Sequence, residues 1–370
     1  MALNLEEKKS TLIEQYDEKC RIYQSFLAEI EHQITSILQT SQVVCNAITS
    51  RLKTRESLTE KIERKQNKYA DLAEITDIAG VRIITYYAED VDKVADIIES
   101  EFVVDKENSI DKRESLEPDR FGYCSVHYVV SMSEERTALR ECQAYKGMKC
   151  EIQIRSVLQH AWAEIEHDIG YKSEIAVPKE MRRSFSRLAG LLEIADREFN
   201  DIRRSLANYK EAATQKIQQD EFMDKEIDAV LVETIINTNP KVQQLGKYIA
   251  SILNSKLKEQ KDRGYIESTI RELGSLGVKT VRHLHSVIDN YYDTACYVAT
   301  ELLKNYISNE EAEVSPVIAV FYLEYAILLT ERCTHKQIEQ YLVRNNIGEP
   351  ENLEETVEEL YRIGEAISKR

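Results

Sequence analysis

One segment, Lys149–Lys172, constrains the fold of this chain more than any other. It reads KCEIQIRSVLQHAWAEIEHDIGYK, and its first half alternates apolar and polar residues with the period of a half-buried β-strand. The pattern then changes and predicts a helix over residues 157–170. A carboxylate, an amide and a guanidinium lie in register on the polar row of the strand, contributed by Glu151, Gln153 and Arg155. Such a row can bind a divalent metal, the amide edge of a ligand and a phosphate at the same time. If no other polar cluster accompanied it, the row would be interpreted as the solvated face of a sheet.

Strand and helix patterns alternate along the chain before this segment. In order they predict helix 5–45, strand 47–53, helix 57–68, strand 78–87, helix 90–101, strand 102–104, polar loop 105–121 and strand 125–132. This order indicates an α+β fold, with a mixed β-sheet flanked by helices. We expect the sheet domain and its trailing helices to span residues 46–212, with residues 1–45 as a helical segment packed on it.

Strand patterns disappear after Pro178. Residues 180–210 are helical and charged, and four or five amphipathic segments follow from Lys225. These patterns predict an all-α C-terminal domain over residues 216–370. We expect it to have a regulatory or interaction role, because charged amphipathic helices without a chemical motif usually pack against partners or neighbours.

Charge and composition narrow the class of ligand. The formal net charge of −16 argues against a general nucleic-acid coat protein, which phosphates would repel. Residues 51–68 nevertheless hold seven basic residues against three acids, which favours a specific site for a small phosphorylated ligand. The seven cysteines are scattered without a CxxC pair, and the N-terminus lacks the apolar core of a secretory signal. Reduced thiols in a cytoplasmic protein are therefore expected.

We call the predicted strand that carries Glu151, Gln153 and Arg155 the signature strand. Three further polar clusters could complement its polar row: RLKTRES with Lys61, DIAGVR from Asp77, and FGYCSVH from Phe121. Each cluster also has an ordinary structural explanation. The first could be a solvated helix end, and Asp77 of the second could cap a turn. In the third, the tyrosine could be a core residue and the histidine could be hydrogen-bonded for structural reasons. Together the clusters provide the groups that a nucleotide-dependent phosphoryl-type transfer needs. Asp77 and Glu151 could share a Mg²⁺ ion, basic residues could hold a triphosphate, and Tyr123 could stack on a base. Walker A, kinase HRD and GxGxxG motifs are absent.

Four motifs make the sequence recognisable: SRLKTRESLTEKI, DIAGVR, FGYCSVHY and EIQIRSVLQHAWAEIEHDIGYK. In this order and spacing they resemble the RelA/SpoT-like synthetase domain that makes (p)ppGpp, over about residues 45–175. The resemblance implies a GTP pyrophosphokinase that moves the β,γ-pyrophosphate of ATP to the 3′-hydroxyl of GDP or GTP in stringent-response-type signalling. Nothing resembles the HD hydrolase, TGS or ACT domains of the long members, so the chain looks like a small alarmone synthetase with an added helical region.

The resemblance also implies roles for individual residues. Asp77 and Glu151 would bind Mg²⁺, with Glu151 also placed to activate the acceptor hydroxyl. The residues implied for ATP are Arg51, Lys53, Ser57, Lys61 and Arg82. Those implied for the guanine nucleotide are Tyr123, His127, Gln153, Arg155 and His160. Lys112 and Arg113 would replace basic residues where the loop departs from the family's Lys-Asp-Tyr run and Lys-Pro pair.

Alternatives remain open at this stage. His160, Glu164 and His167 share a helix face, which allows a metal site as a minor reading. The acceptor could instead be the 3′ end of tRNA, as in toxic relatives, with the C-terminal helices as an antitoxin-like module. The domain could also be a degenerate nucleotide sensor. A homo-oligomer, or intramolecular regulation by the C-terminal helices, is expected in either case, and no membrane partner is expected.

Overall fold

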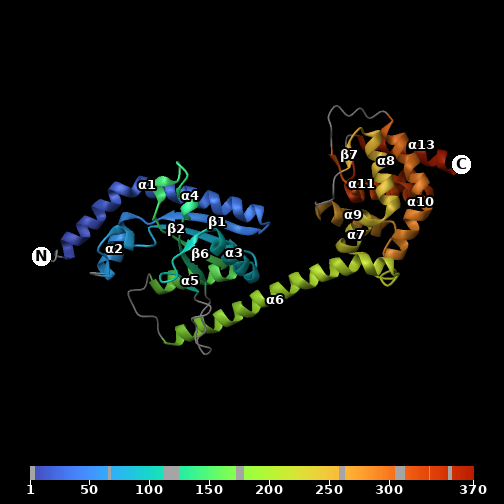
Figure 1. Ribbon diagram of the computed structural model, residues 1–370. Coiled ribbons are helices and arrows are strands. Elements are labelled where there is room, and N and C mark those ends of the chain that lie inside the picture. Colours follow the sequence, from blue (N-terminus) through green and yellow to red (C-terminus); the bar gives the residue numbers. More distant parts are fainter. Residues whose placement is uncertain are drawn as a thin grey trace. The chain divides into compact units, whose positions relative to one another are not determined.

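A computed structural model describes residues 5–65, 68–111, 125–171, 179–257, 263–304, 313–332, 334–348 and 352–370 (Figure 1). The chain divides into two compact units, 1–203 and 204–370, and the division falls within helix α6 (Lys179–Gln218). The sequence patterns place the junction somewhat later, between residues 212 and 216, and that boundary stays a prediction.

The first unit is built on a six-stranded sheet. Its strands are β1 (Cys45–Leu52), β2 (Ala79–Thr85), β3 (Val103–Val104), β4 (Ile110–Asp111), β5 (Val126–Ser131) and β6 (Cys150–Ser156). The order is β1-β2-β6-β5-β3, and β4 pairs with β5. Strands β2 and β6 run parallel while the other pairs are antiparallel, so the predicted mixed sheet is confirmed. The signature strand lies at its centre.

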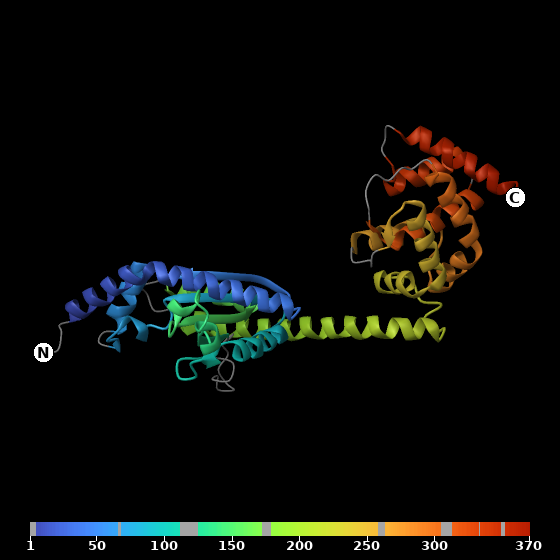
Figure 2. The same cartoon turned by 45° about the horizontal axis from the view of Figure 1, so that its top comes forward.

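One face of the sheet carries the core of this unit. Helix α1 (Leu5–Thr40) and helix α3 (Ala88–Glu101) contribute to the same apolar cluster as the strands. Figure 2 shows α1 running along the strands. The fully buried side chains of this cluster include Phe26, Ile30, Ile34, Ile83, Ile98, Ile152 and Ile154. Because side chains alternate along a strand, the polar row of β6 is left for the opposite face.

Three more helices complete the first unit: α2 (Arg55–Lys65), α5 (Val157–Tyr171) and the first part of α6. The short elements are η2 (Leu72–Glu74), α4 (Glu134–Thr137) and η3 (Gln143–Tyr145). The Ser156 hydroxyl at the end of β6 donates to Asp196 Oδ2 of α6 at 2.7 Å. Arg203 Nη1 of α6 lies 2.6 Å from Asp90 Oδ2 of α3. Both contacts stabilise the packing of α6 on the rest of the first unit. Two expectations were inexact: α1 ends at Thr40, and the predicted loop 105–121 contains β4.

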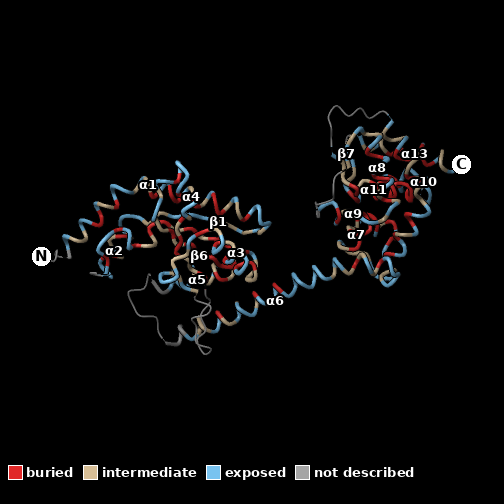
Figure 3. Tube along the Cα trace, in the orientation of Figure 1, coloured by how far each residue is buried: buried red, intermediate tan, exposed pale blue. Residues whose placement is uncertain are grey.

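The second unit is helical, as the sequence predicts. Its helices are α7 (Ala229–Thr238), α8 (Pro240–Ile252), α9 (Arg263–Ser275), α10 (Val281–Leu303), α11 (Val317–Glu331), α12 (His335–Asn345) and α13 (Leu353–Ser368). Most residues of α11 are buried in an apolar core to which the other helices contribute (Figure 3). The described residues thus form more helices than the four or five expected.

The helical second unit also contains two short strands that the sequence patterns did not reveal: β7 (Lys256–Leu257) and β8 (Glu313–Val314) form a small parallel pair. Two-residue strands are too short for a period of two to be recognised in a sequence. Among the described residues of the whole chain, every helix is too short or too polar to cross a bilayer.

Candidate active site

Strand register brings the polar residues of the sheet together. Across β1, β2 and β6, Arg51 is opposite Gly80 and Gly80 is opposite Glu151. Two residues further along the strands, Arg82 is opposite Gln153, and Gln153 is opposite His127 of β5. Residues directly opposite each other project from the same face of a sheet. The register therefore gathers side chains from distant parts of the sequence on the polar face.

Asp77 is held by two lysines just before β2 begins. Its Oδ1 lies 2.7 Å from Lys61 Nζ, and its Oδ2 lies 3.2 Å from Lys53 Nζ. Lys53 follows β1, where its backbone N–H donates to the carbonyl of Ile78, and Lys61 comes from α2. The side chains of both lysines are less than one-fifth exposed. The two cations thus neutralise Asp77 in a largely enclosed position.

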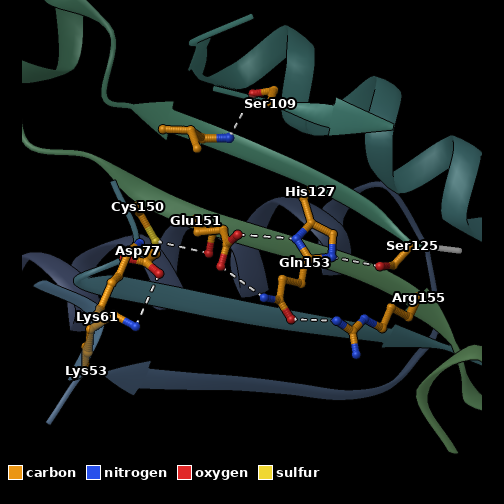
Figure 4. A network of polar contacts seen from close by, with 11 residues as sticks. Lys53, Lys61, Asp77, Ser109, Ser125, His127, Cys150, Glu151, Gln153 and Arg155 are labelled. Atoms are coloured by element: carbon orange, nitrogen blue, oxygen red, sulfur yellow. Dashed lines mark hydrogen bonds and ion pairs between the residues drawn. The ribbon is translucent and has the colours of Figure 1, made fainter. Parts of the chain in front are cut away.

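Glu151 sits at the centre of a hydrogen-bonded row (Figure 4). Its Oε1 lies 3.2 Å from His127 Nδ1, and its Oε2 accepts a 2.9 Å bond from the Gln153 amide. His127 Nε2 contacts Ser125 Oγ at 2.7 Å, and the Gln153 carbonyl accepts from Arg155 at 2.9 Å. Burial alone would raise the pKa of Glu151, but the hydrogen bonds from His127 and Gln153 and the charges of His127 and Lys61 lower it to about 2. Glu151 is therefore ionised at neutral pH.

A second charged group borders the site. Arg82 Nη1 donates to Glu164 Oε1 of α5 at 2.9 Å, and His160 Nδ1 lies 3.7 Å from the same oxygen. Burial and the neighbouring Arg82 lower the pKa of His160 and also that of Arg155. Helix α5 thus places an acid over Arg82 directly after the strand that carries Glu151.

These residues surround a cavity of about 450 Å³ on the polar face. Of the expected site residues, the cavity is lined by Arg51, Lys53, Asp77, Arg82, Glu151 and Gln153. Lys61 and His127 reach it through their contacts with Asp77 and Glu151. The structure therefore brings the two acids into one cavity together with three basic residues.

Other expected residues lie at the margin or outside the described chain. Ser57 lies in the first turn of α2, where its backbone N–H donates to Thr54 Oγ1 at 3.2 Å. Arg155 and His160 contact lining residues but do not line the cavity themselves. Tyr123, Lys112 and Arg113 lie outside the described residues.

Sequence reasoning did not assign Glu164 to the nucleotide site, although the structure places it in the cavity wall against Arg82. Glu164 was considered only as a metal ligand beside His160 and His167. Among the described residues, no group of three or more metal-ligating side chains is assembled. In the sequence, the sign that Glu164 belongs to the site is its position one helical turn after His160. The sequence does not show that β2 places Arg82 against that turn; this is seen only in the structure.

The site residues fit a divalent cation that is shared with a substrate. Asp77 and Glu151 provide hard oxygen donors in one cavity, and Mg²⁺ in nucleotide sites is usually bound by one or two carboxylates plus phosphates. Lys53 and Lys61, which now neutralise Asp77, carry charges that phosphate oxygens could also satisfy. The donor set is thus compatible with a magnesium–nucleotide complex.

Comparison with known proteins finds relatives for the N-terminal half of the chain. A family model for the region found in RelA/SpoT proteins matches residues 50–176. The chain is 28% identical to the GTP pyrophosphokinase YjbM of Bacillus subtilis over 172 residues, which are 46% of this chain and 77% of that protein. It is 26% identical to the GTP pyrophosphokinase YwaC of the same species, over 53% of this chain and 94% of the relative.

Among solved structures, small alarmone synthetase 2 from Bacillus subtilis aligns with 51% of this chain and 98% of its own, at 26% identity and a TM-score of 0.44. The matched family region contains every expected site residue, from Arg51 to His160, and ends before α6. Residues 50–176 of this chain are therefore similar to the region found in RelA/SpoT proteins.

Proposed function

We propose that the N-terminal unit is a GTP pyrophosphokinase, which transfers the β,γ-pyrophosphate of ATP to the 3′-hydroxyl of GDP or GTP. The observation that carries the proposal is one cavity lined by Asp77, Glu151 and the basic side chains of Arg51, Lys53 and Arg82. The relatives named GTP pyrophosphokinase support the same class of reaction. The coarser conclusion, a pyrophosphotransferase, rests on both.

ATP binding is assigned to the basic side of the cavity. Arg51 and Arg82 would hold the adenine, while Lys53, Lys61 and Ser57 would contact the phosphates. Phosphoryl-type transfer depends on positioning and on neutralising negative charge that is spread over several oxygens. The lysines can supply this neutralisation because phosphate oxygens can replace the Asp77 carboxylate as their partners.

Asp77 and Glu151 would hold Mg²⁺. The ion would polarise phosphate oxygens and offset the charge that develops during transfer. In the free enzyme Glu151 has a pKa of about 2, which suits a cation ligand better than a general base, whose ideal pKa is near the working pH. For Glu151 to take the proton of the acceptor hydroxyl, its contact with His127 would have to weaken once substrates bind.

The acceptor would lie on the His127 side of Glu151. We assign Gln153, Arg155, His127 and His160 to acceptor binding, together with Tyr123, Lys112 and Arg113, which lie outside the described residues. The relatives do not favour transfer to tRNA. Assembly into a homo-oligomer and regulation by the second unit stay predictions.

Purified full-length protein tests this function directly. With ATP, Mg²⁺ and GDP or GTP it should release AMP and a guanosine nucleotide pyrophosphorylated at the 3′ position. Asp77→Asn and Glu151→Gln should each lower kcat by at least about 10²-fold, the usual loss for a group that stabilises transition-state charge. The exposed Glu141→Gln is a matched control in the same unit and should turn over normally. Undiminished turnover in either acid variant would remove the assignment, and labelled transfer to tRNA but not GDP would change the acceptor.

A further inference from the structure

A second cavity, of about 640 Å³, lies within the helical unit between α9, β8, α11 and α12. Its volume is within the range of about 300–1,000 Å³ that is usual for small-molecule sites. Val317, Ile318 and Phe321 of α11 provide an apolar wall, and Glu272 and Asn345 provide polar groups. The cavity belongs wholly to the second unit and shares no residue with the nucleotide site.

Asn345 is buried in the wall of this cavity, and its side-chain amide makes no hydrogen bond. The residue is only 6% exposed, and within the described chain neither its Oδ1 nor its Nδ2 has a hydrogen-bond partner. Leaving buried polar groups unpaired costs on the order of 1–3 kcal/mol. A ligand that hydrogen-bonds to the amide would recover this loss. An unpaired amide beside an apolar wall is therefore a sign of a binding site.

One of two paired acids, Glu272, lines the same cavity as Asn345. Glu324 of α11 is fully buried and accepts a hydrogen bond from the Tyr341 hydroxyl at 3.2 Å, and Glu272 of α9 is 8% exposed. Burial, the charge of Glu272 and a hydrogen bond between the two carboxyl groups raise the pKa of Glu324 well above its usual value. The surroundings of Glu324 therefore favour its neutral form, while Glu272 lines the cavity.

Among the described residues, the lining of this cavity contains no lysine, arginine or histidine, whereas Glu272 contributes a carboxyl group. A phosphorylated nucleotide would find no cationic side chain in this lining to pair with its phosphates. Phe321 and Tyr265 instead offer aromatic rings, whose faces attract cations.

We propose that this cavity binds a small alkylguanidinium cation. Glu272 and the Asn345 carbonyl oxygen accept hydrogen bonds from its planar N–H groups, and its alkyl part packs on Val317 and Phe321. A guanidinium presents several donors in one plane, which suits a carboxylate and an amide oxygen in the lining of one cavity. The second unit is then a sensor or docking module for a cationic group, independent of the nucleotide site.

Isothermal titration calorimetry of the full-length protein tests the proposal with a matched pair of probes, butylguanidine and butylurea. The two have almost the same shape, but only the first is charged. Saturable binding is expected for butylguanidine and not for butylurea. Glu272→Gln should weaken that binding at least about tenfold, since hydrogen bonds to charged groups contribute about 1.5–3 kcal/mol. Glu267→Gln, an exposed change on the same helix, should leave it unaltered.

A second variant separates binding from folding. Asn345→Leu removes the unpaired amide and should keep or raise the melting temperature while abolishing the thermal shift caused by butylguanidine. N-acetyl-arginine methylamide, tested in parallel, distinguishes an arginine side chain of a peptide from a free alkylguanidinium, because only the former carries flanking backbone. Absent binding of both guanidinium probes, equal binding of butylurea, or unchanged affinity in Glu272→Gln would each overturn the proposal. Nucleotide turnover is not a readout here, so failure would leave the proposed enzyme untouched.

Discussion

Asp196 provides a prediction whose size can be worked out. It is 4% exposed on α6, accepts a hydrogen bond from Ser156 at the end of the signature strand, and burial raises its pKa from 3.8 to about 6. A carboxyl group with a raised folded-state pKa favours folding while it is protonated. Its contribution is intact below pH 4 and is lost as the pH rises from 3.8 through 6. A shift of about two pKa units corresponds to about 3 kcal/mol of stability that is missing at pH 8.

Asp196→Asn should therefore stabilise the first unit at pH 8 by up to about 3 kcal/mol, because the amide oxygen still accepts from Ser156 and no charge is buried. The advantage should shrink to nothing as the pH approaches 4. Urea unfolding followed by tryptophan fluorescence measures this, since the only tryptophan, Trp162, lies in this unit. The exposed Glu198→Gln on the same helix should change stability by less than about 0.5 kcal/mol at every pH. A pH-independent difference between Asp196→Asn and the parent would refute the reasoning.

Three further predictions concern the nucleotide site. His127→Leu should raise the pKa of Glu151 above its value of about 2, because it removes a hydrogen bond and a charge that lower it. His127→Asn should raise this pKa less, because the amide can replace the ring Nδ1 as a hydrogen-bond donor. A ¹³C NMR titration of the Glu151 carboxyl group measures both, and equal shifts would contradict the prediction. Glu164→Gln should change the free energy of unfolding by less than about 1 kcal/mol, because the ion pair of Glu164 with Arg82 is partly exposed. The same change should alter the KM for ATP. An unchanged KM would exclude Glu164 from the ATP site. Gly80→Ala should keep the melting temperature, because a Cβ there makes only ordinary contacts, 3.6 Å from the Arg51 carbonyl oxygen and 3.8 Å from that of Glu151. It should raise the KM for ATP by narrowing the cavity, and normal kinetics would contradict this.

Much of the first unit could be predicted because its signals are local. The alternation of Cys150, Ile152 and Ile154 with Glu151 and Gln153 determines which face of β6 is buried, whatever its neighbours are. The same holds for the helices, whose apolar faces recur at helical spacing. The two-residue strands β3, β4, β7 and β8 carry no comparable period. Of these, only β3 was expected.

The site itself depends on contacts that no local pattern specifies. That Lys53 and Lys61 neutralise Asp77, and that Glu164 lies against Arg82, follows from the packing of α2 and α5 on the sheet. In the second unit, no sequence motif singled out Glu324. Its burial beside Glu272 arises because α11 is enclosed by other helices.

By itself, the sequence determined which residue types are available and which face of each strand or helix is apolar, because side-chain alternation and helical periodicity are properties of neighbouring residues. Only the tertiary structure decided which charges neutralise one another and where cavities remain. Those outcomes depend on strand register and helix packing between segments that lie far apart in the chain, where a shift of one residue would turn every side chain to the other face.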